Sequence, residues 1–385
     1  MTVTTPKGFT AAGVACGLKQ NGNRDFAVVL NNGPEYAAAA VTTFNRVFAA
    51  PVGWTRQAVQ DGTLHAVVLN SGGANACTGD QGYSDTVATA HLAGAQLGVA
   101  PGEVAICSTG LIGELLDMDA VRAGIESACS TLSVDGGAEA AQAIMTTDTR
   151  PKTAAFSGEY AIGGMAKGAG MLAPQLATML VVLTTDAVLS SEQADTALAT
   201  AMEHSFNRID SDGCMSTNDT VILMASGASG IVPDQREFTA NLSRVAQDLA
   251  EQLIRDAEGA SHDIAVEVTG ASSQQAGLAV ARSVARSNLL KCAVFGNDPN
   301  WGRVLSSLGT VPVEVAPFDA NAVDVSINGV TVCRNGGVGE PRELVDMSGR
   351  LVTIAIDLKA GTESVRLLTN DLTYGYVEEN SAYSS

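Results

Sequence analysis

Apolar residues recur along the chain with two different periods. Between Glu237 and Glu258 they fall at every third or fourth position, which is the spacing of a helix with one buried face. In Asp263–Thr269 they alternate with other residues, a pattern typical of a half-buried strand. The helical period also predicts helices at Ser84–Leu97, Asp119–Leu132, residues 190–206 and Gln275–Leu290. Asp119 and either Ser190 or Ser191 are the expected N-caps of two of these helices.

Short apolar runs indicate the strands. They are expected at Arg24–Leu30, Ala37–Thr43, Ala66–Leu69, Val104–Cys107, Leu176–Leu183, Val221–Ala225, Cys292–Phe295, Val323–Ile327, Val330–Cys333, Leu351–Leu358 and Ser364–Leu368. Asn328-Gly329 separates two of these runs, which is a hairpin signal. Because helices and strands recur in both halves, the pattern predicts an α/β protein in which helices cover packed sheets, with a β-rich C-terminal portion.

The segment Gly163–Asp186 combines glycines with one of these apolar runs. Four glycines predict a loop whose backbone can approach another group closely, and Lys167 lies within it. Pro174 would interrupt any helix before the expected strand begins. By pattern alone, Thr178 is an ordinary β-branched residue at the junction of loop and strand.

Composition narrows the class of protein. Of the 385 residues, 46% are hydrophobic and 16% charged, which predicts a compact folded protein rather than a disordered one. The net charge of −19 argues against nucleic acid or an anionic membrane as a partner, because both attract basic surfaces. The negative charge would also attract cationic small molecules, although an acidic surface more often serves solubility. No apolar run has the length needed to cross a bilayer.

The spacing of the cysteines and histidines indicates neither a metal site nor a disulfide framework. The seven cysteines form no C-x-x-C pair, so we expect free thiols packed as small apolar residues in a reducing cytoplasm. The first residues lack the pattern of a signal peptide. The four histidines have no metal-ligand spacing, and residues 168–170 lack the third glycine of a dinucleotide loop. We therefore expect no metal site and no nucleotide cofactor.

A longer motif changes the interpretation of Thr178. The sequence KGAGMLAPQLATML, residues 167–180, closely resembles the signature of the ornithine acetyltransferase family, the glutamate N-acetyltransferases of arginine biosynthesis. The resemblance extends over most of the chain, through NSGGANACTG, STGLIG, MTTDT and GNDPNWGR to the last residue. It implies a layered α–β–β–α arrangement. Cys214 occupies a position where the family frequently has Asp.

The resemblance implies that the chain cuts itself between Ala177 and Thr178. Residues 1–177 and 178–385 would then interleave in one catalytic unit and assemble as an (αβ)2 heterotetramer or a higher oligomer. The freed threonine would be nucleophile and base in one residue. An α-amine has a pKa near ~8, so part of it is neutral and can accept the hydroxyl proton.

Further site residues follow from the same resemblance, position by position. Thr109 and Gly110 would form the oxyanion hole. Lys167 would bind the substrate α-carboxylate, and Glu258 the side-chain ammonium of ornithine. Thr147 is favoured over Thr146 as a substrate contact. Asn380 and Ser385 would return from the C-terminus to the site.

The implied reaction moves an acetyl group from N2-acetylornithine to glutamate through an acetyl-threonine intermediate, with ping-pong kinetics and no cofactor. The sequence leaves open whether acetyl-CoA is also a donor, and whether the protein is a paralogue in a secondary pathway. One alternative is an amidase or aminopeptidase that uses the same nucleophile with water as acceptor. Another is an uncleaved binding protein with a purely structural glycine loop.

Overall fold

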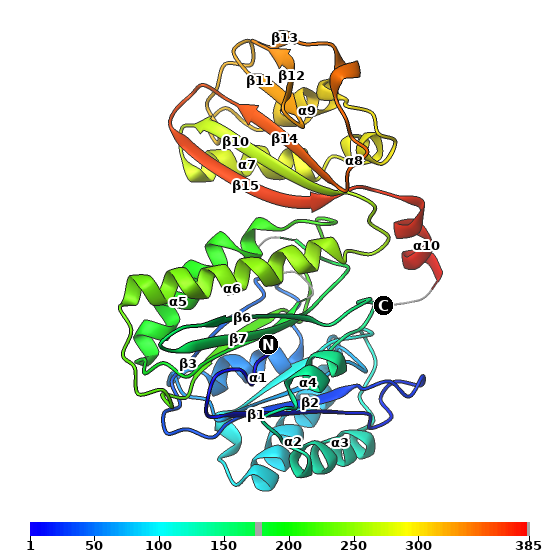
Figure 1. The fold of residues 1–385 in the computed structure, drawn as a ribbon. Helices are drawn as coiled ribbons and strands as arrows, with labels where there is room; N and C mark the ends of the chain where they lie inside the picture. The colour runs from blue at the N-terminus through cyan, green and yellow to red at the C-terminus, as the bar shows by residue number, and fades with distance from the viewer. Residues whose placement is uncertain (174–178, 383–385) are drawn as a thin grey trace. The chain divides into compact units, whose positions relative to one another are not determined.

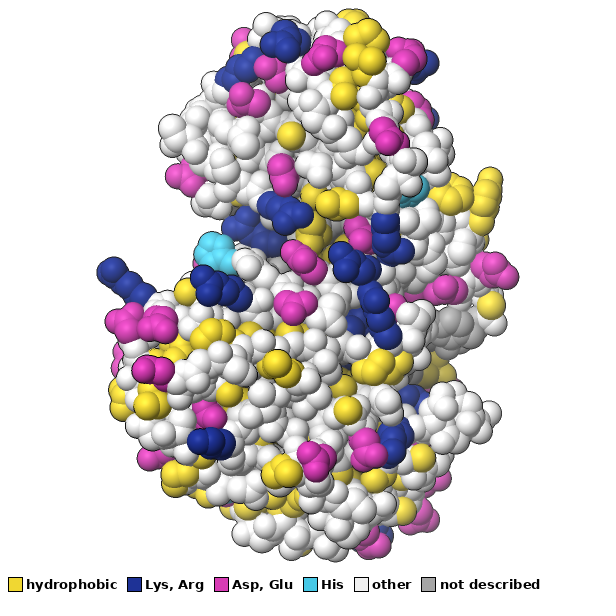
Figure 2. Space-filling model, viewed as in Figure 1, with side chains coloured by type: hydrophobic (Ala, Val, Ile, Leu, Met, Phe, Trp, Pro, Cys, Tyr) yellow, Lys and Arg dark blue, Asp and Glu magenta, His cyan; other side chains and the backbone are white. Residues whose placement is uncertain are grey.

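The chain divides into two units in the computed structural model, which describes residues 1–173 and 179–382. Unit 1 comprises Met1–Asn207 and Cys214–Asp256, and unit 2 comprises Arg208–Gly213 and residues 257–382 (Figure 1). Figure 2 shows Asp and Glu side chains spread over the drawn face of both units, in keeping with the net charge of −19. Among the described residues, no helix is both long and apolar enough to span a membrane.

Unit 1 contains two sheets. The first has four strands in the order β1 (Phe9–Val14), β2 (Phe26–Asn31), β4 (Ala66–Asn70) and β5 (Val104–Ser108). The second has five, in the order β3 (Ala38–Thr42), β9 (Thr220–Ala225), β8 (Leu180–Thr185), β7 (Ala161–Lys167) and β6 (Lys152–Ser157). In this second sheet β8 is antiparallel to β7 and parallel to β9.

Both faces of the four-stranded sheet are buried, which explains why its strands read as continuous apolar runs. Val29 and Leu69 point into a core shared with Val182 and Ile222 of the five-stranded sheet. On the opposite face the same strands pack against α2 (Gly79–Leu97) and α3 (Met118–Ser130), while α5 (Ser191–His204) and α6 (Gln235–Arg255) cover the five-stranded sheet. Unit 1 also contains α1 (Ala50–Ala58), α4 (Gly137–Ala143) and the short η1 (Pro101–Glu103), and the short η2 (Phe206–Arg208) begins in unit 1 and ends at Arg208 of unit 2. The layered α–β–β–α expectation is confirmed within unit 1.

Unit 2 is built on one six-stranded sheet, in keeping with the predicted β-rich C-terminal portion. Its order is β13 (Gly337–Val338), β12 (Val330–Arg334), β11 (Asp324–Ile327), β14 (Leu351–Asp357), β10 (Asp263–Ala271) and β15 (Glu363–Asn370). The helices α7 (Gln274–Ala285), α8 (Asn288–Phe295) and α9 (Trp301–Leu308) contribute to its apolar core. The last helix is α10 (Tyr374–Ala382), and η3 (Arg342–Leu344) precedes β14.

Several predicted boundaries were wrong. Gly163, Gly164 and Lys167 lie in strand β7, not in a loop, because glycine allows close packing there: a Cβ on Gly164 would lie 2.9 Å from the Leu249 side chain of α6. The loop begins at Gly168. Strand β8 starts at Leu180, and the first residues of the predicted run Leu176–Leu183 lie outside the described part of the chain.

Three helix predictions also need correction. Helix α6 ends at Arg255, so Glu258 lies in a turn three residues beyond it rather than at its C-terminus. The predicted helix Gln275–Leu290 is two helices, α7 and α8, and Cys292–Phe295 belongs to α8 rather than to a strand. So short an apolar run cannot be assigned by period alone. The N-cap of α3 is Asp117, whose side chain accepts two backbone hydrogen bonds, and not Asp119.

Candidate active site

A buried lysine joins the two sheets of unit 1. Lys167 is the last residue of β7 and is 1% exposed. Its Nζ lies 3.3 Å from Thr109 Oγ1, to which it donates a hydrogen bond. Thr109 directly follows β5 of the four-stranded sheet. The fold therefore brings together two of the residues that the sequence motifs single out.

Thr109 and Gly110 make a tight turn at the end of β5. The Thr109 N–H donates to the Asn70 carbonyl at 3.0 Å, and Thr109 forms an isolated β-bridge with Gly73. Gly110 has a φ of +131°, which L side chains rarely adopt. A Cβ at that position would lie 2.8 Å from the Gly73 nitrogen. Glycine is required here both for conformation and for space.

A buried carboxylate lies beside the start of the glycine loop. Asp148 Oδ1 accepts hydrogen bonds from the Gly168 N–H at 2.7 Å and from Lys152 Nζ at 2.5 Å, while Oδ2 accepts from the Thr146 N–H at 2.9 Å. Burial raises the pKa of Asp148, but the Lys167 and Lys152 ammonium groups and the Gly168 N–H outweigh it, so the pKa lies below its ordinary value. Asp148 is therefore an ionised anchor for this loop.

A second buried carboxyl group holds the residue that follows Thr178. Asp219 Oδ1 accepts the Met179 N–H at 2.9 Å, and the Thr220 N–H donates to the Met179 carbonyl at 3.1 Å. Burial raises the pKa of Asp219 well above its ordinary value, against the opposing effects of the Met179 N–H and the Lys167 ammonium. Asp219, which directly precedes β9, therefore holds the Met179 amide with a carboxyl group that favours its protonated form more than an exposed aspartate does.

The segment before Asp219 is tied to the other sheet. Asn218 Nδ2 donates to the Ser108 carbonyl at 2.8 Å and to the Ala74 carbonyl at 2.6 Å. Ser108 immediately precedes Thr109. The start of β9 and the end of β5 thus have fixed positions relative to each other, and both lie close to Lys167 in the structure of unit 1.

A cavity of about 520 Å³ opens beside this cluster within unit 1. Its lining includes Thr146, Asp148 and Lys19, and Lys19 Nζ donates to the Met145 carbonyl at 2.6 Å. Burial lowers the pKa of Lys19, and the Lys167 ammonium adds to that effect. Thr147, the favoured substrate contact, is half-buried beside Thr146. The lining of this cavity thus combines the basic side chains of Lys19 and Arg24 with the carboxylate of Asp148.

Two of the carried-over residues meet in unit 2. Glu258 is 7% exposed, and Asn380 Nδ2 of α10 donates to Glu258 Oε2 at 2.8 Å. The structure therefore forms a Glu258–Asn380 pair from segments more than a hundred residues apart in sequence. Ala177, Thr178 and Ser385 lie outside the described residues.

The chain is similar over nearly its whole length to known proteins, and this similarity identifies its family. Residues 10–385 match the ArgJ family. The chain is 58% identical over 391 residues to the arginine biosynthesis bifunctional protein ArgJ of Bifidobacterium longum, and the match covers both proteins entirely. It is also 58% identical over 386 residues, with full coverage of both, to the protein of the same name from Streptomyces avermitilis. The chain belongs to the ArgJ family.

Solved structures of ArgJ-family proteins match as well. Ornithine acetyltransferase from Mycobacterium tuberculosis, solved in complex with ornithine, is 52% identical. That match covers 46% of this chain and 96% of the other at a TM-score of 0.45. Family membership makes this ArgJ-family chain an acyltransferase of arginine biosynthesis, as the sequence motifs predict.

Several charged residues of this ArgJ-family site were missed from the sequence. Asp148 and Lys152 carry a signal, since opposite charges four residues apart often pair on a helix, but here Asp148 precedes β6 and Lys152 is its first residue. Asp219 and Asp256 give no local signal that they are buried. The cysteine prediction was partly wrong: Cys77, Cys214 and Cys292 are exposed, although Cys107 and Cys333 are buried as expected.

Proposed function

We propose that this ArgJ-family acyltransferase moves the acetyl group of N2-acetylornithine to glutamate through an acetyl ester on Thr178. The threonine becomes N-terminal when the chain cuts itself between Ala177 and Thr178. The observation that carries the proposal is the buried contact of Lys167 with Thr109, beside Gly110. This contact places the Lys167 ammonium beside Thr109 and Gly110, the residues proposed to stabilise the oxyanion, although they lie far from Lys167 in the sequence.

The cut would follow from the chemistry of a hydroxyl next to its own amide. The Thr178 Oγ attacks the Ala177 carbonyl carbon, and the amide nitrogen leaves with a proton, which converts the peptide bond into an ester. Water then hydrolyses the ester. The products are a carboxylate on Ala177 and a free α-amine on Thr178. Asp219 supports this step by fixing the adjoining Met179 amide.

Acetyl transfer would use the Thr178 hydroxyl oxygen first as the nucleophile and then as the leaving group. The α-amine of Thr178 accepts the hydroxyl proton as Oγ attacks the acetyl carbonyl, and the proton then passes to the departing α-amine of ornithine. The Thr109 hydroxyl and the Gly110 N–H stabilise the oxyanion in the tetrahedral state. The neutral α-amine of glutamate then attacks the ester carbonyl, the bond between the acetyl carbon and Thr178 Oγ breaks, and a proton from the attacking amine passes through the Thr178 α-amine to Oγ, which regenerates Thr178. This double displacement gives ping-pong kinetics.

Charge complementarity supports the assignment of substrate contacts. Lys167 provides a point positive charge for the α-carboxylate that both substrates share. Glu258, with Asn380 bonded to it, provides a buried negative charge for the side-chain ammonium of ornithine. Thr147 and Ser385 are the remaining proposed contacts. Acetyl-CoA as an alternative acetyl donor can be tested in the turnover assay described below.

The sheet topology supports the expectation that both products of the cut form one catalytic unit. Strand β7 precedes the proposed cut and β8 follows it, yet the two are paired from Ile162↔Thr185 to Lys167↔Leu180. Strand β9 pairs on the far side of β8 with register Leu180↔Thr220 onward. Assembly of these interleaved pieces into an (αβ)2 or higher oligomer is part of the proposal.

Turnover with and without acceptor tests the function. The purified protein is incubated with N2-acetylornithine alone and then with glutamate, and ornithine, acetate and N-acetylglutamate are quantified. We expect N-acetylglutamate to form in equal amount to ornithine, with parallel double-reciprocal plots. Release of acetate at the same rate in both mixtures would instead identify a hydrolase and overturn the proposal.

A further inference from the structure

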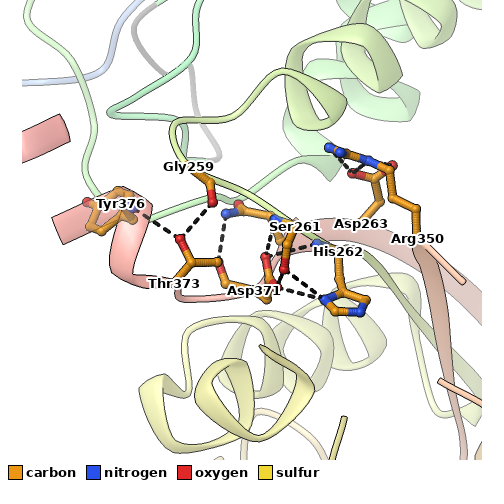
Figure 3. A network of polar contacts seen from close by, with 9 residues as sticks. Gly259, Ser261, His262, Asp263, Arg350, Asp371, Thr373 and Tyr376 are labelled. Atoms are coloured by element: carbon orange, nitrogen blue, oxygen red, sulfur yellow. Dashed lines mark hydrogen bonds and ion pairs between the residues drawn. The ribbon is translucent and has the colours of Figure 1, made fainter. Parts of the chain in front are cut away.

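The carboxylate of Asp371 is the centre of a hydrogen-bond network in unit 2. Asp371 directly follows β15 and is 1% exposed. Its Oδ1 accepts the backbone N–H of Ser261 at 2.9 Å and of His262 at 3.0 Å. Its Oδ2 accepts the Ser261 hydroxyl and lies 2.8 Å from His262 Nδ1 (Figure 3). Two consecutive residues thus direct four polar groups at one carboxylate.

This arrangement is not a catalytic triad, although it contains Ser, His and Asp. In a triad the serine bonds one ring nitrogen and the aspartate the other. Here the Ser261 Oγ and the Asp371 carboxylate both lie next to Nδ1 of His262, at 3.1 and 2.8 Å. The Ser261 hydroxyl donates to the carboxylate and not to the imidazole, so the His262 ring is not placed as its general base. The network therefore has a structural or positioning role.

The network joins the turn before β10 to the start of α10. Thr373 Oγ1 donates to the Gly259 carbonyl at 2.6 Å and accepts the Tyr376 N–H at 3.1 Å (Figure 3). Gly259 has a φ of +61°, and a Cβ there would collide with the Tyr376 nitrogen. The two backbones are in direct contact at this point.

The Glu258–Asn380 pair is carried by these two segments. Glu258 precedes Gly259 in the turn, and Asn380 lies one helical turn after Tyr376, whose carbonyl also accepts from Asn380 Nδ2 at 3.0 Å. Any shift of the turn against α10 changes the 2.8 Å contact between Asn380 and Glu258. The position of the pair depends on the network centred on Asp371.

We propose that Asp371 is a positioning residue that sets the buried Glu258–Asn380 pair to receive the cationic side chain of the substrate. The inference rests on the proposed function, in which Glu258 binds the ornithine ammonium. Asp371 itself does not touch the substrate. Its effect on binding is therefore specific for substrates with a side-chain ammonium.

Asp371→Asn is the sharpest variant, because it keeps the shape and changes one acceptor into a donor. With its oxygen kept for the two backbone N–H groups, the amide would present its nitrogen to the Ser261 hydroxyl and to His262 Nδ1, so both of these contacts must rearrange. Asp263→Asn is the matched control. Asp263 lies next to His262, and its carboxylate accepts Arg350 Nε at 3.1 and 3.2 Å, away from the contact between Gly259 and Tyr376 (Figure 3).

The experiment measures kcat and KM of the full-length processed enzyme for N2-acetylornithine and for N-acetylnorvaline, which lacks the side-chain ammonium. We expect Asp371→Asn to raise KM for N2-acetylornithine about tenfold, with kcat within about threefold of the parent. KM for N-acetylnorvaline stays unchanged, as do both KM values in Asp263→Asn. If Asp371→Asn fails to fold, Thr373→Val tests the same junction and should raise KM about threefold.

Glu258→Gln separates this inference from the proposed function. Combined with Asp371→Asn it should raise KM no further than Glu258→Gln alone, because both act through one contact. An unchanged KM in Asp371→Asn, an equal rise for both substrates, or additive effects in the double variant would overturn the positioning role. If the parent enzyme transfers no acetyl group from N2-acetylornithine, the proposed function fails instead.

Discussion

At the scale of single residues, the main feature of unit 1 is charge buried next to hydroxyl and backbone groups. Lys167 contacts Thr109, and its ammonium lowers the pKa of Asp148 and opposes the upward shift of Asp219. Buried charge is costly unless it is paired and hydrogen-bonded. Buried charged groups with shifted pKa values are typical of functional sites. A site that binds a substrate carboxylate, for example, needs a positive charge held at a fixed position.

Gly110→Ala tests the turn that is proposed to hold the oxyanion. The added Cβ would lie 2.8 Å from the Gly73 nitrogen, at a φ of +131° that alanine rarely adopts. The displaced N–H should lower kcat by at least about a hundredfold. Gly102→Ala is the control, because a Cβ there meets nothing within 4 Å. Comparable kcat values for the two variants would remove Gly110 from the mechanism.

Asp219→Asn tests the neutral state of the carboxyl group that holds Met179. The pKa of Asp219 in the folded protein lies above its ordinary value of 3.8, so the folded state retains a proton that the unfolded state loses. Asp219 therefore destabilises the fold increasingly as the pH rises above about 4. Asn keeps the acceptor for the Met179 N–H. Its melting temperature should exceed that of the parent at pH 8, and the difference should shrink towards pH 4; a constant difference would contradict this.

The sequence motifs singled out Thr109, Lys167, Glu258 and Asn380, and the structure pairs Lys167 with Thr109 and Glu258 with Asn380. Asp219 could not be singled out in this way. Its burial and its contact with Met179 arise only when β9 pairs with β8. Side-chain contacts between residues distant in sequence are set by tertiary packing and leave no local pattern.

At the scale of elements, patterning predicted strands better than helix ends. Central strands such as β8 and β9 are buried on both faces and stand out as apolar runs. Helix α6 was found from its period, but its end at Arg255 was not, because the apolar spacing continues into the turn that holds Glu258. The short helix α8 was mistaken for a strand because eight residues show too few turns to reveal a period.

Lys152 links elements and should be required for stability. It is fully buried in β6, with Nζ at 2.5 Å from Asp148 Oδ1 and 2.6 Å from Asp256 Oδ2, just beyond α6. Lys152→Met removes the ammonium group that the two buried carboxylates share and should lower the free energy of unfolding by about 3–5 kcal/mol. The exposed pair Arg366–Glu267 gives the control, since Arg366→Met should cost less than about 1 kcal/mol. Equal losses in chemical denaturation would contradict a structural role for Lys152.

At the scale of the whole molecule, the chain order and the sheet order differ in an informative way. In the five-stranded sheet, β8 and β9 follow the Ala177–Thr178 bond in sequence and lie together between β3 and β7, which precede it. The hydrogen bonds of β8 to both neighbours do not depend on that bond. We therefore expect this sheet to persist after a cut at that bond.

The two proposed fragments should therefore co-purify. In native size-exclusion chromatography, fragments 1–177 and 178–385 should elute in one peak and separate only in denaturant, because β8 pairs with β7 along six residue pairs. The uncleaved Thr178→Ala variant provides the reference elution volume. Separation of the fragments in native buffer would be incompatible with an interleaved catalytic unit.

Intact mass spectrometry of the purified protein, before and after mixing with N2-acetylornithine in the absence of glutamate, tests the central claim most directly. We predict two fragments that divide between Ala177 and Thr178, and a gain of one acetyl group on the C-terminal fragment only, which disappears when glutamate is added. A single unbroken chain that turns over the substrate, or an acetyl group on the N-terminal fragment, would contradict the account.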